Sequence, residues 1–364
     1  MTTEAAAQAE GGVAPAVSTG DPVVPTRPYA PSWVNSLLDW LVRLPGPTWV
    51  AYAALGAIGA SGAVGLALSS GIDDVAVIGG QVFWGLFLPL TLWLMHHLAR
   101  VAETSLVAFR PATDLSDAEV ARLRYELAVA PARPAVIILV LMAIFTPAYY
   151  VLDPVSSAIV GLSPLALVGR YASEVFFGSV SVVLVYQSIR QLRSVSRIQA
   201  QATHVDLLRP APLYAFSILT SRTAIVIALV FLLPTSVTLQ SFSGPTWWIW
   251  VPWLGGGIIA AVAVFVLPLR GVQRRIVAEK ERLQGEVGLR VAATMEAVHR
   301  SVDDRDFAAA SALNSTLSSL IAERDLVSRL PTWPWQPGTG RAVVSAIALP
   351  IGLWLTTRVL ERLI

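Results

Sequence analysis

The sequence predicts an all-α membrane protein with seven transmembrane helices and a cytoplasmic helical hairpin, and three observations lead to this fold class. Hydrophobic residues make up 55% of the chain and the mean hydropathy is +0.63. Charged residues make up 14%, against about 25% in a typical soluble domain. Seven segments are apolar over the roughly 20 residues that a helix needs to cross the hydrocarbon core, and the connectors between them alternate in charge.

The charge of these connectors predicts the orientation of the chain. Arginines gather between the second and third segments, between the fourth and fifth, and after the sixth. The other three connectors contain no basic residue: 71–75, 153–164 and 235–246. Because short loops rich in Arg and Lys stay in the cytoplasm, we expect a multi-pass protein of the cell membrane with its N-terminus inside. Seven spans then place the C-terminus outside.

Each span is placed on its apolar run. The first six make a transmembrane region over residues 47–269, and the seventh lies within residues 341–364. The spans are Trp49–Leu68, Val75–Leu98, Ala135–Leu152, Leu165–Gln187, Tyr214–Leu233, Trp247–Leu269 and Ala342–Leu360. The first and sixth are rich in glycine and alanine, so both are expected at close helix contacts. Prolines inside the second, third and seventh predict kinks: Pro89, Pro147 and Pro350.

The segment before the first span divides into two parts. Residues 1–30 have little charge and are rich in Ala, Gly, Pro, Thr and Val, so we expect a disordered tail. Residues 31–46 predict an amphipathic helix in the cytoplasmic interface, with a helix packed on the bundle as the alternative. Its apolar side chains recur on one helical face: Trp33, Leu37, Trp40, Leu41 and Leu44.

The cytoplasmic connectors are also expected to be helical. Ser116 and Glu119 form a capping-box pattern that opens a helix running to about Val129. Residues 270–340 predict an antiparallel helical hairpin, because two amphipathic runs flank a short acidic turn. The runs are carried by Ile276, Leu283, Val287, Val291, Met295 and Val298, and then by Phe307, Leu313, Leu317, Leu320, Ile321, Val327 and Leu330.

Three ionisable residues within the spans form a candidate intramembrane polar site, because charges in lipid are costly and mark functional positions. Arg170 and Glu174 lie four residues apart on the fourth span and share one helical face. They predict either a structural ion pair, with Arg170 extending toward the outer headgroups, or a polar cavity or ion path. Arg222, on the fifth span, is either a third member of this site or an interfacial anchor.

Several classes of function are disfavoured by what the sequence lacks. There is no cysteine, and the chain contains no phosphate-binding loop, zinc-protease helix or nucleophile elbow, so we expect no enzyme activity and no cofactor. The positive charge lies at the ends of spans and not on one face, which argues against a nucleic-acid partner. The remaining metal candidates match no known ligand spacing: His96, His97, His204 and Asp206.

Three features of the chain resemble one known family. The connector Ser188–Leu213 is rich in arginine, the sixth span runs on into Arg270–Val302, and a helix at Arg305–Arg329 precedes a Pro-broken start of the last span. This layout is similar to that of the seven-transmembrane ion channels that include insect odorant and gustatory receptors. The resemblance implies an oligomer with a cytoplasmic anchor domain and a last helix that lines a pore. The last span has none of that family's aromatic-rich motif, so no functional residue is transferred.

Three functions are compatible with these patterns. The leading hypothesis is a channel-like or receptor-like homo-oligomer in the bilayer, assembled through residues 270–330. Its pore would be lined by a stripe on the seventh span, which otherwise marks a helix contact: Ser345, Gly352 and Thr356. The second is a non-conducting scaffold or signalling subunit whose hairpin docks a soluble cytoplasmic partner. The third is a small-molecule carrier that uses the face of Arg170 and Glu174.

Overall fold

Helices make up 89% of the residues that the computed structural model describes, and no strand occurs among those residues. The description covers residues 27–71, 75–152, 162–200, 211–238, 250–335 and 338–363. The predicted all-α class is therefore confirmed. Most of the predicted disordered tail, residues 1–26, lies outside the described part of the chain.

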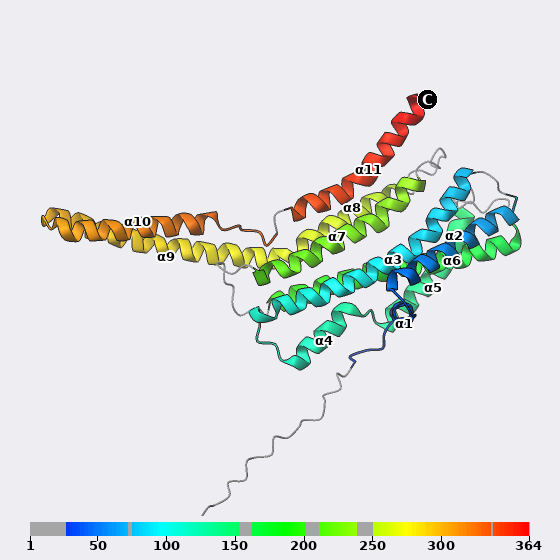
Figure 1. Cartoon of the computed structure of the whole chain (residues 1–364), viewed down its shortest axis with the longest axis horizontal. Coiled ribbons are helices and arrows are strands. Elements are labelled where there is room, and N and C mark those ends of the chain that lie inside the picture. The colour runs from blue at the N-terminus through cyan, green and yellow to red at the C-terminus, as the bar shows by residue number, and fades with distance from the viewer. Residues whose placement is uncertain are drawn as a thin grey trace, which may run out of the picture.

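The long helices run side by side, and two of them project from one end of the body (Figure 1). The helices are α1 Trp33–Arg43, α2 Thr48–Ser69, α3 Val75–Phe109, α4 Asp117–Ala128, α5 Ala132–Leu152, α6 Pro164–Ala200, α7 Ala211–Thr238, α8 Trp250–Val266, α9 Arg270–Asp303, α10 Phe307–Arg329 and α11 Thr339–Leu363. A three-residue 3-10 turn, Leu267–Leu269, separates α8 from α9 at Pro268. The projecting pair is α9 and α10, which pack against each other.

Six stretches of the described residues are long and apolar enough to cross a membrane. They are Thr48–Ser69, Ile78–Phe109, Ala132–Leu152, Pro164–Ile198, Phe216–Pro234 and Gly255–Asp303. The seventh predicted span falls in α11, where the apolar stretch Thr339–Gly352 is shorter than the others. The helix lengths therefore indicate membrane insertion, while the count of seven spans stays a prediction.

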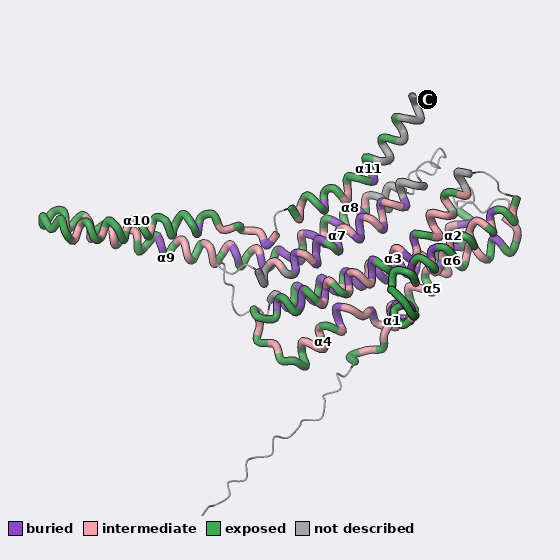
Figure 2. Tube along the Cα trace, in the orientation of Figure 1, coloured by how far each residue is buried: buried purple, intermediate pink, exposed green. Residues whose placement is uncertain are grey.

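The spans differ in how far they are covered by protein. In α7, 67% of the apolar window is buried inside the bundle, whereas in α5 only 17% is buried. Figure 2 shows the same contrast along the two tubes. The exposed side chains of α5 are large and aliphatic or aromatic: Ile137, Leu141, Ile144 and Phe145. Helix α7 is thus the central element, and α5 presents the kind of surface that hydrocarbon chains cover.

The backbones of α2 and α3 lie in direct contact. A Cβ atom added to Gly85 would lie 2.4 Å from the amide nitrogen of Ala60, and one added to Gly59 would lie 2.8 Å from the carbonyl oxygen of Gly85. Only glycine fits at this crossing, as small residues do at helix contacts in lipid. In the glycine-rich sixth span the prediction holds only in part, because Gly257 packs on Phe231 while Gly255 and Gly256 have open space around them.

The short connection between α4 and α5, here called the α4–α5 turn (residues 127–132), is bonded to segments from both sides. The segment before α1 pairs with it through Ser32 N–H to Ala130 O at 2.8 Å and Ala132 N–H to Ala30 O at 3.0 Å. The buried Asn35 side chain accepts a hydrogen bond from Ala130 N–H and donates one to Ala128 O.

Helix α6 completes the partners of this turn. Gln187 and Gln191, one helical turn apart and both buried, each donate a side-chain N–H to the carbonyl oxygen of Leu127, at 2.9 and 2.5 Å. The Tyr29 hydroxyl donates to Val129 O at 2.9 Å, and the Arg190 guanidinium lies 4.3 Å from the centre of the Tyr29 ring. The turn is therefore clamped between the N-terminal segment and α6.

The buried face of α1 agrees with the predicted one except at Trp40, since Trp33, Leu37 and Leu44 pack against the core that contains Leu41. Val34, Leu38 and Leu41 are buried, whereas Trp40 is 56% exposed. The reason is Asn35, which lies on the same face as Val34 and Leu38 and is drawn inward to the α4–α5 turn. The buried side of α1 is therefore turned toward Asn35, which leaves the Trp40 ring outside the core.

Replacing Asn35 by alanine is expected to destabilise the protein, because Ala130 N–H would remain buried without a partner. A buried unpaired donor costs on the order of 2 kcal/mol, so the Asn35→Ala protein should aggregate at a clearly lower temperature in detergent, followed by size-exclusion chromatography. Ser36→Ala is the matched control, since Ser36 is exposed and adjacent. Equal melting of the two variants would contradict the role given to Asn35.

Titration of Tyr29 provides a second test of the clamp. Burial raises the pKa of the Tyr29 hydroxyl to about 12, and the nearby Arg190 guanidinium only partly offsets this. Because the folded-state pKa lies above the ordinary value of about 10, the stabilisation is present below pH 10 and is lost as the pH rises through 12. The phenolate absorbance is measured against pH for the wild-type protein and for Tyr29→Phe. The difference between the two curves should rise in one step near pH 12. A step near pH 10 would mean that Tyr29 is not buried at the turn.

Candidate functional site

Arg170 and Glu174 form an ion pair on the first part of α6. The Arg170 Nε atom lies 2.5 Å from Glu174 Oε1, and the two side chains are 17% and 27% exposed. Their one-turn spacing on the helix sets this geometry. The carboxylate is thus held by a guanidinium and not left open to solvent, which supports the structural interpretation of the pair.

Helix α5 closes over the pair from one side. Tyr150, which is 8% exposed, interacts electrostatically with both Glu174 and Arg170. The Tyr171 hydroxyl donates a hydrogen bond to Ala143 O at 2.9 Å, and a Cβ added to Gly178 would lie 2.3 Å from the methyl carbon of Met142. The α5–α6 contact is therefore close-packed around the charges, and the arrangement holds a compensated charge pair inside an apolar interface.

Arg222 does not join this pair. It lies exposed on α7, and its Nη1 atom is 3.0 Å from the Nε2 atom of His97 on α3. The Trp93 ring stacks on His97 with centroids 5.6 Å apart. The three ionisable residues predicted as one site thus occupy two places, because α7 presents Arg222 toward α3 and away from the start of α6.

The residues around His97, the partner of Arg222, bear on the interpretation of Arg222 as an interfacial anchor. Leu94, Met95 and Leu98, which flank His97 on α3, pack in one cluster with Leu38 and Leu41 of α1. An amphipathic helix such as α1 lies at a membrane interface. Arg222 and His97 therefore lie close to the packing site of α1, which favours the anchor interpretation of Arg222, while its depth in the membrane stays a prediction.

The stripe on α11 points away from the bundle. Ser345, Gly352 and Thr356 are all exposed, and the Thr356 hydroxyl donates only to the carbonyl of Gly352, at 2.9 Å. The opposite face of α11, with Val343 and Ile347, packs into the cluster formed by α7 and α8. Against the described residues of one chain the stripe stays exposed, so both of its predicted roles call for another molecule.

The candidate metal ligands fall only partly within the described residues. Among the residues that the structure describes, no group of three or more His, Cys, Asp and Glu side chains converges. His204 and Asp206 lie outside the described residues. His96 Nδ1 lies 3.4 Å from the Tyr52 hydroxyl.

The meeting of His97 with Arg222 was not predicted, although the sequence carries a signal for it. Trp93, His97 and Arg100 follow one another at spacings of four and three, so they lie on one face of α3. A run of aromatic and basic residues at the end of a span is typical of an interfacial binding face. What the pattern lacked was the partner, which comes from a helix 125 residues away.

Comparisons with protein-family models, with curated proteins and with solved structures gave no match to this chain.

Breaking the Arg170–Glu174 pair should destabilise the protein more than removing it altogether. Glu174→Ala removes the carboxylate that balances the charge of Arg170 in an apolar interface, at a cost of about 2 kcal/mol after allowance for partial exposure. The double variant Arg170→Leu, Glu174→Leu should recover most of this loss, measured as thermal unfolding in detergent. Glu296→Ala is the control, since the Arg300–Glu296 pair is 70% and 75% exposed. A double variant no better than the single one would contradict a structural pair.

Proposed function

We propose that this chain is a seven-span, channel-like or receptor-like homo-oligomer, with the N-terminus cytoplasmic and the C-terminus outside, that conducts or senses small ions or ligands. The observation that carries the proposal is the attachment of α11. This helix contacts the bundle through Val343 and Ile347 and turns its polar stripe outward. A hydroxyl-bearing stripe on the outside of a membrane helix gains partners when several copies of the helix surround a water-filled axis.

The α9–α10 hairpin supports assembly on the same side of the molecule. It projects from the body, and α10 and α11 both lie along the upper edge in Figure 1. An axis along this edge would bring both elements of each subunit next to those of its neighbours. Large apolar side chains remain exposed on the hairpin and its tip: Leu289, Met295, Val302, Phe307, Ile321 and Leu326. Large apolar side chains exposed outside the spans favour contact with another protein.

Side-chain hydrogen bonds hold the two helices of the hairpin together. Lys280 Nζ donates to the carbonyl oxygens of Ser328 and Leu330 at 2.6 and 2.8 Å, which ties the base of α9 to the end of α10. Arg282 bonds Glu279 and Glu286 along α9. At 1.5 Å per residue, the 34 residues of α9 extend about 50 Å. An arm of this length is suited to holding subunits together beyond the membrane.

Ion flux into liposomes tests the pore. Ser345→Trp should block flux, because the indole would fill a narrow axial path, whereas Val344→Trp should not, since Val344 is 65% exposed on a different face of α11. Particle images in nanodiscs should show a ring with α11 at its axis. A monomer without flux, or equal flux through both variants, would contradict the proposal.

A scaffold or signalling subunit is the second candidate, favoured by the distance to which the hairpin extends from the body (Figure 1). In that case a soluble partner covers the exposed apolar side chains of α9 and α10. Deletion of residues 276–330 would then abolish partner binding while the bundle still inserts, and the full-length protein would be monomeric. A carrier that uses Glu174 has less support, because that carboxylate is already bonded to Arg170.

A further inference from the structure

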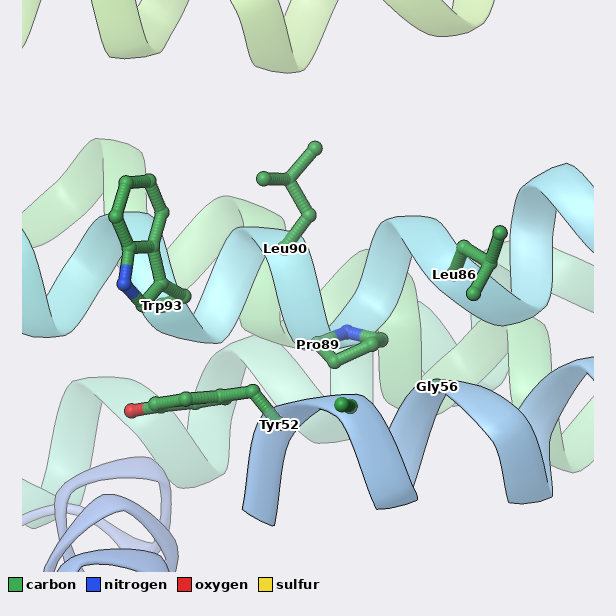
Figure 3. Close-up of a pocket in the computed structure, with 7 residues that line it drawn as sticks. Tyr52, Gly56, Leu86, Pro89, Leu90 and Trp93 are labelled. Carbon is green, nitrogen blue, oxygen red and sulfur yellow. The ribbon is translucent and has the colours of Figure 1, made fainter. Parts of the chain in front are cut away.

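A groove opens between α2 and α3 where Pro89 interrupts the side of α3. Its volume is about 240 Å³. Figure 3 shows Tyr52 and Gly56 of α2 beneath Pro89, with Leu90 and Trp93 projecting from α3. The lining is apolar apart from the Tyr52 hydroxyl and the Trp93 indole N–H: Tyr52, Ala53, Gly56, Leu86, Pro89, Leu90 and Trp93. Leu86 and Trp93 are 50% and 41% exposed, so the groove opens to the surroundings of the bundle.

One end of this groove is positively charged. Trp93 stacks on His97, and His97 is bonded to Arg222 of α7. The charged side chains that act on His97 are Arg222 and Arg100, with no carboxylate among them. Asp39 of α1 acts on the neighbouring His96, together with Arg100 and His97. Within the described part of the chain, neither Arg100 nor Arg222 lies within salt-bridge distance of an acidic group.

This charged end lies at the arginine-rich interface of the membrane. The neighbours of His97 on α3 pack with α1, as described above, and Arg100 follows one turn farther along. The apolar groove extends from there toward the middle of the span, over Leu90, Pro89 and Leu86. A ligand that fits must therefore be apolar on the membrane side and anionic on the interfacial side.

We propose that this groove binds an acidic phospholipid of the leaflet at the arginine-rich end of the bundle. The phosphate is held by the guanidinium groups of Arg222 and Arg100, because a planar guanidinium can donate two parallel N–H bonds to two oxygens of a phosphate. An acyl chain lies in the groove against Trp93, Leu90 and Pro89. Basic pockets between helices at the cytoplasmic interface bind anionic headgroups in this way. The inference is independent of the proposed pore.

Native mass spectrometry of the delipidated full-length protein tests the site. The protein is titrated with phosphatidylglycerol, with phosphatidylcholine of the same acyl chains, and with inorganic phosphate. We expect phosphatidylglycerol to bind more tightly than phosphatidylcholine, and inorganic phosphate not to compete with it. Arg222→Gln should weaken phosphatidylglycerol binding about fivefold, the effect of one basic residue near an anionic lipid surface, and Arg100→Gln should act in the same direction.

Matched variants separate this site from general attraction to the bilayer. Arg133 is exposed at the start of α5, so Arg133→Gln should leave binding unchanged. Ala53→Trp fills the groove and should reduce binding, whereas Ala54→Trp, at the next exposed position of α2, should not. Equal binding of the two lipids, full competition by inorganic phosphate, or an equal loss with Arg133→Gln would overturn the proposal. Because Arg222 and Arg100 are separate tests, misfolding of one variant leaves the other decisive.

Discussion

The hydrogen bonding of the α4–α5 turn is the constraint on which the rest of the described structure depends. A turn exposes peptide groups that no helix satisfies, and each one buried without a partner costs about 1–3 kcal/mol. Here those groups are satisfied from two sides, by Ser32 and Asn35 before and within α1 and by Gln187 and Gln191 of α6. The turn is therefore stable in its place only when three segments, distant in sequence, have come together.

This constraint explains why α6 is longer than one crossing of a membrane requires. To reach Leu127, α6 has to continue through Gln187 and Gln191, past the length that hydrocarbon requires. The later part of α6 packs with the end of α3, with Leu127 of α4 and with the start of α7 in a second core: Ala102, Leu106, Phe109, Leu127, Val195, Ile198, Phe216 and Leu219. The core around Leu92, Val183 and Val226 and the second core therefore share α3, α6 and α7 and form one continuous body.

Short sequence patterns were sufficient to predict where α4 begins and where the apolar helices lie. The capping box of α4 forms as the pattern predicts, with Ser116 and Glu119 bonded to each other at the helix start, and the apolar runs locate the spans. Short patterns do not identify which distant residues come into contact, such as His97 with Arg222. The grouping of Arg222 with Arg170 and Glu174 followed from charge and depth alone, but lateral position in a bundle depends on which helices pack together. The inward position of Asn35 could not be predicted either, because helical periodicity does not reveal a backbone turn that needs its amide.

The direct contact of Gly59 with Gly85 has a mechanical consequence for α3. The contact fixes the first part of the helix against α2, Pro89 follows four residues later, and the helix then runs unbroken to Phe109. A proline removes one backbone hydrogen bond and leaves a weak point for bending. From Pro89 to Phe109 the helix extends about 30 Å, so each degree of bending displaces its far end by about half an ångström. A bend at Pro89, beside the groove, would therefore move the end of α3 that packs in the second core.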